Sequence, residues 1–152
     1  MRAFIGLGSN VGDRETWLRK AVGAVGALPG TDVRGVSQLR DTEPVGVTDQ
    51  PRFLNGALEV ETTLGPRELL EALLEIEHKL GRDRSGTRPG GPRTVDLDLL
   101  LYGDALIAEP GLAVPHPRLA ERRFALEPLA DLDPDLEVPA KGRVQALLAE
   151  LR

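Results

Sequence analysis

The sequence predicts an α+β domain with an antiparallel sheet and helices packed on it. Alternating apolar residues mark strands, apolar residues at helical spacing mark two helices, and these elements follow one another in the order βαββαβ. The chain has 152 residues, and 41% of them are hydrophobic, which is enough to bury one core without staples. We therefore expect a single domain over residues 1–152.

Glycines, prolines and capping residues delimit the predicted elements. The elements are a strand at 1–7, a helix capped by Asp13 and stopped by Pro29-Gly30, strands at 33–39 and 53–62, a helix from Pro66 to Gly81, and a strand at 94–102. This order is the split-βαβ, or ferredoxin-like, arrangement. From Asp104 onward we expect a C-terminal extension of proline-rich turns that ends in a short helix at 144–151.

Composition excludes several classes of protein. The chain has no cysteine, which rules out a disulfide scaffold, a thiolate zinc site and a cysteine nucleophile. The net charge of −5 provides no basic field for a nucleic acid backbone. No apolar run approaches the ~20 residues of a membrane span, and the N-terminus lacks a basic-then-apolar signal segment. We expect a soluble cytoplasmic protein that binds neither nucleic acid nor membranes.

Two aspartates, Asp96 and Asp98, lie directly before the apolar run 99–101. In a strand, residues two apart point to the same side with Cα atoms roughly 6.5 Å apart, so both carboxylates face one spot. A like-charged pair beside a core is costly unless a cation compensates, and Mg²⁺ uses hard oxygen ligands of this kind. The pair therefore indicates a magnesium site. The alternative is an acidic pair on the solvent face of the sheet.

An arginine-rich segment precedes the acidic pair in an otherwise acidic protein. Its arginines are Arg82, Arg84, Arg88 and Arg93, and glycines at 86, 90 and 91 leave it free to close over a ligand. Guanidinium forks suit phosphate oxygens, although a solvated charged loop is the alternative. Because metal-type carboxylates and phosphate-type arginines meet at one strand start, the sequence favours phosphoryl transfer.

Other residues and motifs carry weaker signals. Glu77 is either a functional carboxylate at the edge of an apolar helix stripe or an ordinary flanking carboxylate paired with an arginine. His116 either contacts phosphate or holds a proline turn. Gly6 to Gly12 does not fit the dinucleotide fingerprint because its third glycine comes one place late, and no P-loop or Gly-x-Ser-x-Gly elbow occurs.

The segment from Gly91 to Leu100, Gly-Pro-Arg-Thr-Val-Asp-Leu-Asp-Leu-Leu, resembles the signature of the 6-hydroxymethyl-7,8-dihydropterin pyrophosphokinase family of the folate pathway. Further matches follow in the family's order: Gly8-Ser9-Asn10, Thr42 with Pro44 and Gly46, Gln50-Pro51 with Phe53-Leu54-Asn55, Glu77 with Gly81-Arg82 and Arg84, Val114 to Arg118, and Arg122 with Phe124. The family has a ferredoxin-like core, which agrees with the predicted element order.

The resemblance implies that ATP gives its β,γ-pyrophosphoryl group to the hydroxymethyl oxygen of the reduced pterin and leaves as AMP. The implied catalytic residues are Asp96 and Asp98, which would hold two Mg²⁺ ions, with Arg82 and Arg93. The implied ATP contacts are Glu77, Arg84, Arg88, Leu99, His116 and Arg122. The implied pterin pocket is Thr42, Pro44, Val45, Phe53, Asn55 and Phe124. The chain would act on these small molecules as a monomer or weak homodimer.

The sequence departs from the family pattern around the expected nucleotide site. The segment 88–93 lacks the family's tryptophan and is one residue longer. Leu74, Gly111 and Ala113 are apolar or bare where polar nucleotide contacts are common, and Pro117 follows the histidine in place of asparagine or an aromatic residue. These changes bear on nucleotide affinity rather than on the class of reaction.

Two other functions fit parts of the pattern. A non-catalytic ferredoxin-like binding module explains the topology but leaves the acidic pair and the arginines without a role. A metal-dependent nucleotidyltransferase or nuclease would use the same acidic pair, although the net charge of −5 argues against a long polyanionic substrate.

Overall fold

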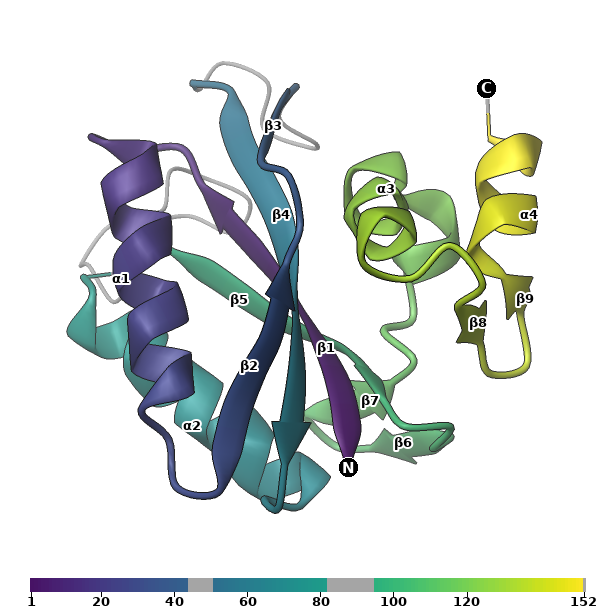
Figure 1. The fold of residues 1–152 in the computed structure, drawn as a ribbon, viewed down its shortest axis with the longest axis horizontal. Helices are drawn as coiled ribbons and strands as arrows, with labels where there is room; N and C mark the ends of the chain where they lie inside the picture. The colour runs from purple at the N-terminus through teal and green to yellow at the C-terminus, as the bar shows by residue number, and fades with distance from the viewer. Residues whose placement is uncertain (44–50, 82–94, 152) are drawn as a thin grey trace.

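The computed structural model describes residues 1–43, 51–81 and 95–151. Its centre is an antiparallel sheet in the order β2-β4-β1-β5, with β3 paired to the start of β4 (Figure 1). The strands are β1 (Arg2–Ser9), β2 (Thr31–Val36), β3 (Arg40–Thr42), β4 (Phe53–Thr62) and β5 (Asp96–Tyr102). Helix α1 (Arg14–Gly26) follows β1 and helix α2 (Pro66–Lys79) follows β4, so the ferredoxin-like prediction is confirmed.

Helices α1 and α2 cover one face of the sheet. The Asp13 carboxylate caps α1 by accepting the Thr16 N–H at 3.2 Å, and Pro66 is the first residue of α2, both as predicted. Between these helices and the sheet lies an aliphatic core, whose fully buried side chains include Leu18, Leu58, Leu69 and Leu73. Burial of this apolar stripe supplies the main driving force for docking the helices.

The predicted strand at 33–39 is wrong in one respect, because β2 ends at Val36 and the next strand, β3, begins only at Arg40. The break comes at Ser37. Its N–H donates to the Ala57 carbonyl at 2.9 Å, and its hydroxyl accepts the Ala57 N–H at 2.9 Å. A side chain thus takes a place in the ladder that a backbone carbonyl would hold in a regular strand, and this ends β2.

The C-terminal extension contains more structure than predicted, and its part from Leu119 onward covers the opposite face of the sheet (Figure 1). Its elements are β6 (Ile107–Glu109), β7 (Leu112–Val114), a 3-10 turn at Leu119–Glu121, α3 (Arg123–Leu132), β8 (Glu137–Val138), β9 (Gly142–Arg143) and α4 (Val144–Glu150). Sequence reasoning missed α3 because Pro128 lies inside it, where proline usually breaks a helix. Burial of Leu126 and Leu129 against the sheet offsets that cost. None of the described helices could span a membrane.

Candidate active site

Strand alternation places two glycines of β1 beside the acidic pair of β5. The apolar neighbours of these glycines belong to the core under α1 and α2, so Gly6 and Gly8 face the other way, toward α3. Asp98 pairs with Gly6 and Asp96 pairs with Gly8. Both aspartates are partly buried and line the same two pockets, as expected for residues on one side of a strand. The space that a side chain would need at these glycines is taken up by Leu100 at Gly6 and by Asn55 at Gly8.

The first pocket, called here the α3 pocket, lies between the sheet and α3. Gly6 and Gly8 form part of its floor, and its walls include Asn55, the acidic pair, Arg122 and Phe124. Its cavity volume is about 30 Å³, so the pocket is narrow.

The second pocket, called here the α2 pocket, lies between α2, β5 and β7 and has a volume of about 380 Å³. Asp96, Asp98 and His116 line both pockets and form the border between them. The four positions that depart from the family pattern, Leu74, Gly111, Ala113 and Pro117, all line the α2 pocket. The side chains at these four positions offer a ligand no hydrogen-bond donor or acceptor. Leu99 also lines the α2 pocket, although its side chain belongs to the core.

Glu77 is buried, with 3% of its surface exposed. Its Oε2 accepts the Leu97 N–H at 2.6 Å. Because β5 is an edge strand, every second N–H along it points away from the sheet and needs another acceptor. Leu97 stands between Asp96 and Asp98, so Glu77 secures the backbone that carries the acidic pair.

His116 is oriented by two backbone contacts. Its N–H donates to the Leu100 carbonyl at 2.9 Å, and its ring Nδ1 accepts the Arg118 N–H at 3.2 Å. With Nδ1 as an acceptor, the proton of the neutral ring lies on Nε2. Burial lowers the pKa of His116 below its ordinary value of 6.5, and Arg122 and Arg118 act in the same direction, while Asp96 opposes them. The ring is thus a neutral donor at the border of the pockets.

We expect His116 to titrate with a midpoint below 6.5 when followed by NMR. Its pKa is lower in the folded chain than in the unfolded chain, so the unfolded chain binds the proton first. The free energy of unfolding therefore falls as the pH drops below 6.5 toward the folded pKa. A midpoint above 6.5 would mean that the Asp96 carboxylate outweighs burial and the arginines.

The remaining residues predicted for the pterin lie around Gly8 and α3. Asn55 is 8% exposed and its Nδ2 donates to Thr42 Oγ1, while Thr42 pairs with Phe53 across β3 and β4. A Cβ atom built at Gly8 would lie 3.7 Å from the Phe53 ring and 2.8 Å from Asn55 Oδ1. On the α3 side, the Arg122 guanidinium lies 5.5 Å from the centre of the Phe124 ring.

Six of the predicted site residues lie outside the described residues: Pro44, Val45, Arg82, Arg84, Arg88 and Arg93. Within the described ranges, no group of three or more His, Cys, Asp or Glu side chains could hold a metal ion. Two carboxylates alone fit Mg²⁺, which commonly takes one or two protein oxygens together with water and substrate phosphates. Sequence reasoning did not predict that Gly6 and Gly8 form part of the floor of the α3 pocket. The available signal was two glycines on one face of an otherwise apolar strand.

Fold and site together define a small ferredoxin-like transferase with an acidic pair between two ligand pockets. The family model for 7,8-dihydro-6-hydroxymethylpterin-pyrophosphokinase (HPPK) matches residues 4–134. The chain belongs to this family.

Curated relatives agree along most of the chain. A 2-amino-4-hydroxy-6-hydroxymethyldihydropteridine pyrophosphokinase of Bacillus subtilis is 49% identical over 138 residues, which are 91% of this chain and 81% of the relative. An enzyme of the same name from Pseudomonas aeruginosa is 44% identical, over 97% of this chain and 90% of the relative. Among solved structures, an HPPK-DHPS triple mutant of Plasmodium falciparum has a TM-score of 0.78 at 15% identity. That match covers 98% of this chain and 44% of the other, and shows a shared fold.

Proposed function

We propose that Asp96 and Asp98 hold two Mg²⁺ ions at the border of the pockets, with ATP in the α2 pocket and the reduced pterin in the α3 pocket. The chain is a pyrophosphokinase of folate biosynthesis, which transfers pyrophosphate from ATP to the hydroxymethyl group of 6-hydroxymethyl-7,8-dihydropterin and releases AMP. The observation that supports our assignment of the substrates is that both pockets share the acidic pair and His116. A transferred group must pass between two substrates, and these residues stand where the two described pockets meet.

The side chains of the site would bind the substrates and stabilise the charge of the transition state. Bound Mg²⁺ would neutralise phosphate charge and lower the pKa of the attacking hydroxyl. Asp96 would accept the hydroxyl proton, and the Nε2–H of His116 would donate to a phosphate oxygen. Arg122 adds positive charge beside them. Because the transition state of phosphoryl transfer is loose and highly charged, positioning and charge neutralisation are its main requirements.

The remaining assignments follow the family resemblance. Arg82 and Arg93 would act on the transferring phosphates, and Arg84, Arg88, Glu77 and Leu99 would contact the nucleotide. Thr42, Pro44, Val45, Phe53, Asn55 and Phe124 would surround the pterin. In this arrangement the pterin stacks against aromatic faces, and the Asn55 amide reads the amide edge of the heterocycle.

The decisive assay measures AMP release from MgATP with and without 6-hydroxymethyl-7,8-dihydropterin. We expect AMP only when both substrates are present, with one pterin diphosphate formed for each AMP. Release of AMP or pyrophosphate on a polynucleotide would support a nucleotidyltransferase or nuclease instead. Tight binding of ATP without turnover under all these conditions would support a non-catalytic binding module.

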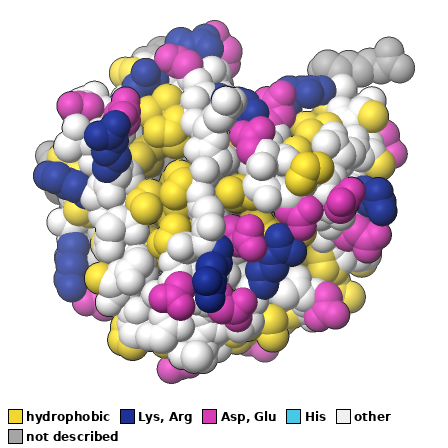
Figure 2. All heavy atoms as spheres, viewed as in Figure 1, with side chains coloured by type: hydrophobic (Ala, Val, Ile, Leu, Met, Phe, Trp, Pro, Cys, Tyr) yellow, Lys and Arg dark blue, Asp and Glu magenta, His cyan; other side chains and the backbone are white. Residues whose placement is uncertain are grey.

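We also propose that the chain acts in the cytoplasm, as one domain and as a monomer or weak homodimer. On the face drawn in Figure 2, Lys and Arg side chains are interspersed with Asp and Glu rather than gathered into a basic field. A mixed surface of this kind suits small-molecule chemistry better than binding to a polyanion. Sedimentation of the purified chain tests its oligomeric state.

A further inference from the structure

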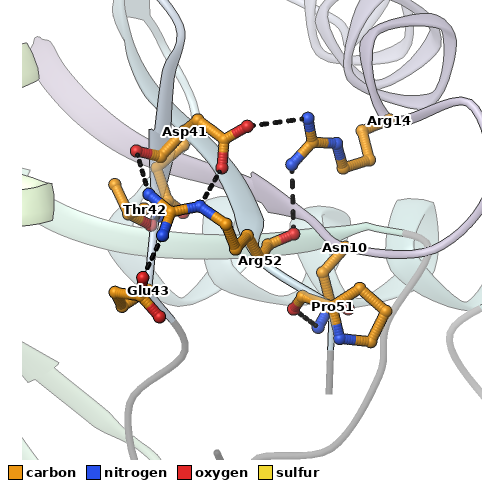
Figure 3. Close-up of polar contacts among 8 residues, drawn as sticks. Asn10, Arg14, Asp41, Thr42, Glu43, Pro51 and Arg52 are labelled. Atoms are coloured by element: carbon orange, nitrogen blue, oxygen red, sulfur yellow. Dashed lines mark hydrogen bonds and ion pairs between the residues drawn. The ribbon is translucent and has the colours of Figure 1, made fainter.

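A cluster of charged side chains joins the end of β3 to the start of β4. The cluster, called here the Asp41 cluster, consists of Arg14 from the first turn of α1, Asp41 of β3, Glu43 just after β3, and Arg52 just before β4 (Figure 3). It brings together three segments: the start of α1, the end of β3 and the residue before β4.

The cluster contains a closed ring of polar contacts around Asp41. The Asp41 carboxylate accepts Arg14 Nη2 at 3.1 Å and Arg52 Nε at 2.7 Å. Arg14 Nη1 then donates to the Arg52 carbonyl at 3.1 Å, and Arg52 Nη2 donates to the Asp41 carbonyl at 3.3 Å (Figure 3). Arg52 also pairs with Glu43. Each of the three ring residues therefore contacts the other two, and two of the four contacts hold backbone carbonyls.

A neighbouring contact joins the residues just before β4 to the segment that precedes α1. Asn10 Nδ2 donates to the Pro51 carbonyl at 3.0 Å, beside the Arg14 contact to the Arg52 carbonyl (Figure 3). Asn10, which precedes α1, and Arg14, its first residue, thus fix two successive carbonyls ahead of β4. Strand β3 has only three residues and pairs with β4 alone. A strand this short needs contacts beyond its ladder to keep one position.

The cluster adjoins the pterin residues on both strands. Asp41 precedes Thr42, Arg52 precedes Phe53, and Thr42 pairs with Phe53 in the β3–β4 register. Thr42 Oγ1 in turn accepts the Asn55 amide nitrogen. A shift of β3 along or away from β4 would therefore move the acceptor that orients Asn55.

Stability alone does not account for the cluster. Asp41 and Arg52 have side chains 50% and 48% exposed, and exposed ion pairs contribute little to the free energy of unfolding. The two arginines nevertheless keep the pKa of the Asp41 carboxyl below its ordinary value, so the cluster stays charged at neutral pH. The main effect of the cluster is on geometry: it holds two backbone carbonyls and one short strand in place.

We propose that the Asp41 cluster is a positioning device for the pterin. It fixes β3 against the start of β4, so that Thr42 holds the Asn55 amide in the orientation that binds the heterocycle. Asp41, Arg14 and Arg52 act through Thr42 and Asn55 and touch no substrate themselves. This inference rests on the proposed pterin pocket and adds three residues that shape it from outside.

The test compares Asp41→Asn with the unaltered chain. Loss of the charge weakens both arginine contacts while keeping the size of the side chain. We expect the dissociation constant of the pterin, measured by calorimetry with a non-hydrolysable ATP analogue and Mg²⁺, to rise about tenfold. The KM for ATP, kcat at saturating pterin and the melting temperature should stay close to those of the unaltered chain.

Glu59→Gln is the matched control, because Glu59 also lies on β4 and accepts a side-chain contact from Arg2 Nε at 2.8 Å. The change removes the carboxylate of the Arg2–Glu59 ion pair, toward the other end of β4. The affinity for the pterin should not change. The double variant Asp41→Asn/Arg52→Gln should bind the pterin about as weakly as Asp41→Asn alone, since both changes break one cluster. Arg52→Lys, which keeps the charge but loses the fork, should weaken binding less than Arg52→Gln.

Two results would overturn the proposal: unchanged pterin affinity in Asp41→Asn, or a loss of affinity equal to that of Glu59→Gln. A lower melting temperature with normal affinity would assign the cluster a purely structural role and would also overturn it. If Asp41→Asn fails to fold, the comparison of Arg52→Lys with Arg52→Gln decides by the same affinity measurement. Failure of the proposed function is distinct, since the unaltered chain would then release no AMP in response to the pterin.

Discussion

Replacing Asp98 by asparagine is expected to lower kcat by roughly 10³-fold or more while leaving the fold intact. The change keeps the shape of the side chain but removes one of the two charges that face the border of the pockets. Asp98 pairs with a glycine and is partly buried, so asparagine meets no steric conflict there. In the proposed two-metal site, the pair would then no longer balance the positive charge of the ions, because an amide lacks the charge of a carboxylate.

The measurement is single-turnover AMP formation across a range of MgCl₂ concentrations. Asp104→Asn, the same substitution at an exposed residue in the turn after β5, is the matched control and should leave the rate unchanged. Unfolding curves of both variants should overlay that of the unaltered chain. A near-normal rate for Asp98→Asn at saturating Mg²⁺ would contradict the proposed two-metal role of the acidic pair.

Local sequence signals were sufficient for the core of the fold. The cap at Asp13, the first-turn proline at 66 and the apolar stripes of the two helices all follow from interactions within a few residues. The errors arose where distant residues override a local preference. Ser37 ends β2 because Ala57, which is 20 residues away, accepts its N–H and donates to its hydroxyl. Likewise, α3 tolerates Pro128 only because the far face of the sheet covers its apolar side.

The candidate site divides in the same way. The same-side placement of Asp96 and Asp98 follows from strand geometry alone, and it could be predicted. The contact of Glu77 with the Leu97 N–H could not be predicted, because it depends on α2 packing beside an edge strand. The Asp41 cluster joins the start of α1 to β3 and to the residue before β4. No periodicity or motif in the sequence marks contacts of that kind. Long-range pairing of exposed charges leaves almost no local trace in a sequence.

Gly8→Ala is expected to raise the KM for the pterin by about 10- to 100-fold, with a much smaller effect on the KM for ATP. The added Cβ atom would lie 2.8 Å from Asn55 Oδ1, a distance too short for a normal contact. Asn55 is buried and its amide nitrogen is held by Thr42, so the amide oxygen moves away only by giving up that hydrogen bond. The predicted loss is therefore that of one buried polar contact to the substrate. Steady-state kinetics with each substrate varied in turn measures it.

Gly23→Ala makes the same chemical change where a Cβ atom meets nothing within 4 Å, in the exposed side of α1. Alanine is favoured over glycine in a helix interior by roughly 0.5–1 kcal/mol, so this control should be slightly more stable and kinetically unchanged. A fall in kcat for Gly8→Ala with an unchanged KM for the pterin would point to Asp96 instead, whose Cβ lies 3.8 Å from the added atom. If Asn55 is the residue affected, Asn55→Ala and the double variant should each raise the KM for the pterin by about as much as Gly8→Ala, because all three remove the same contact.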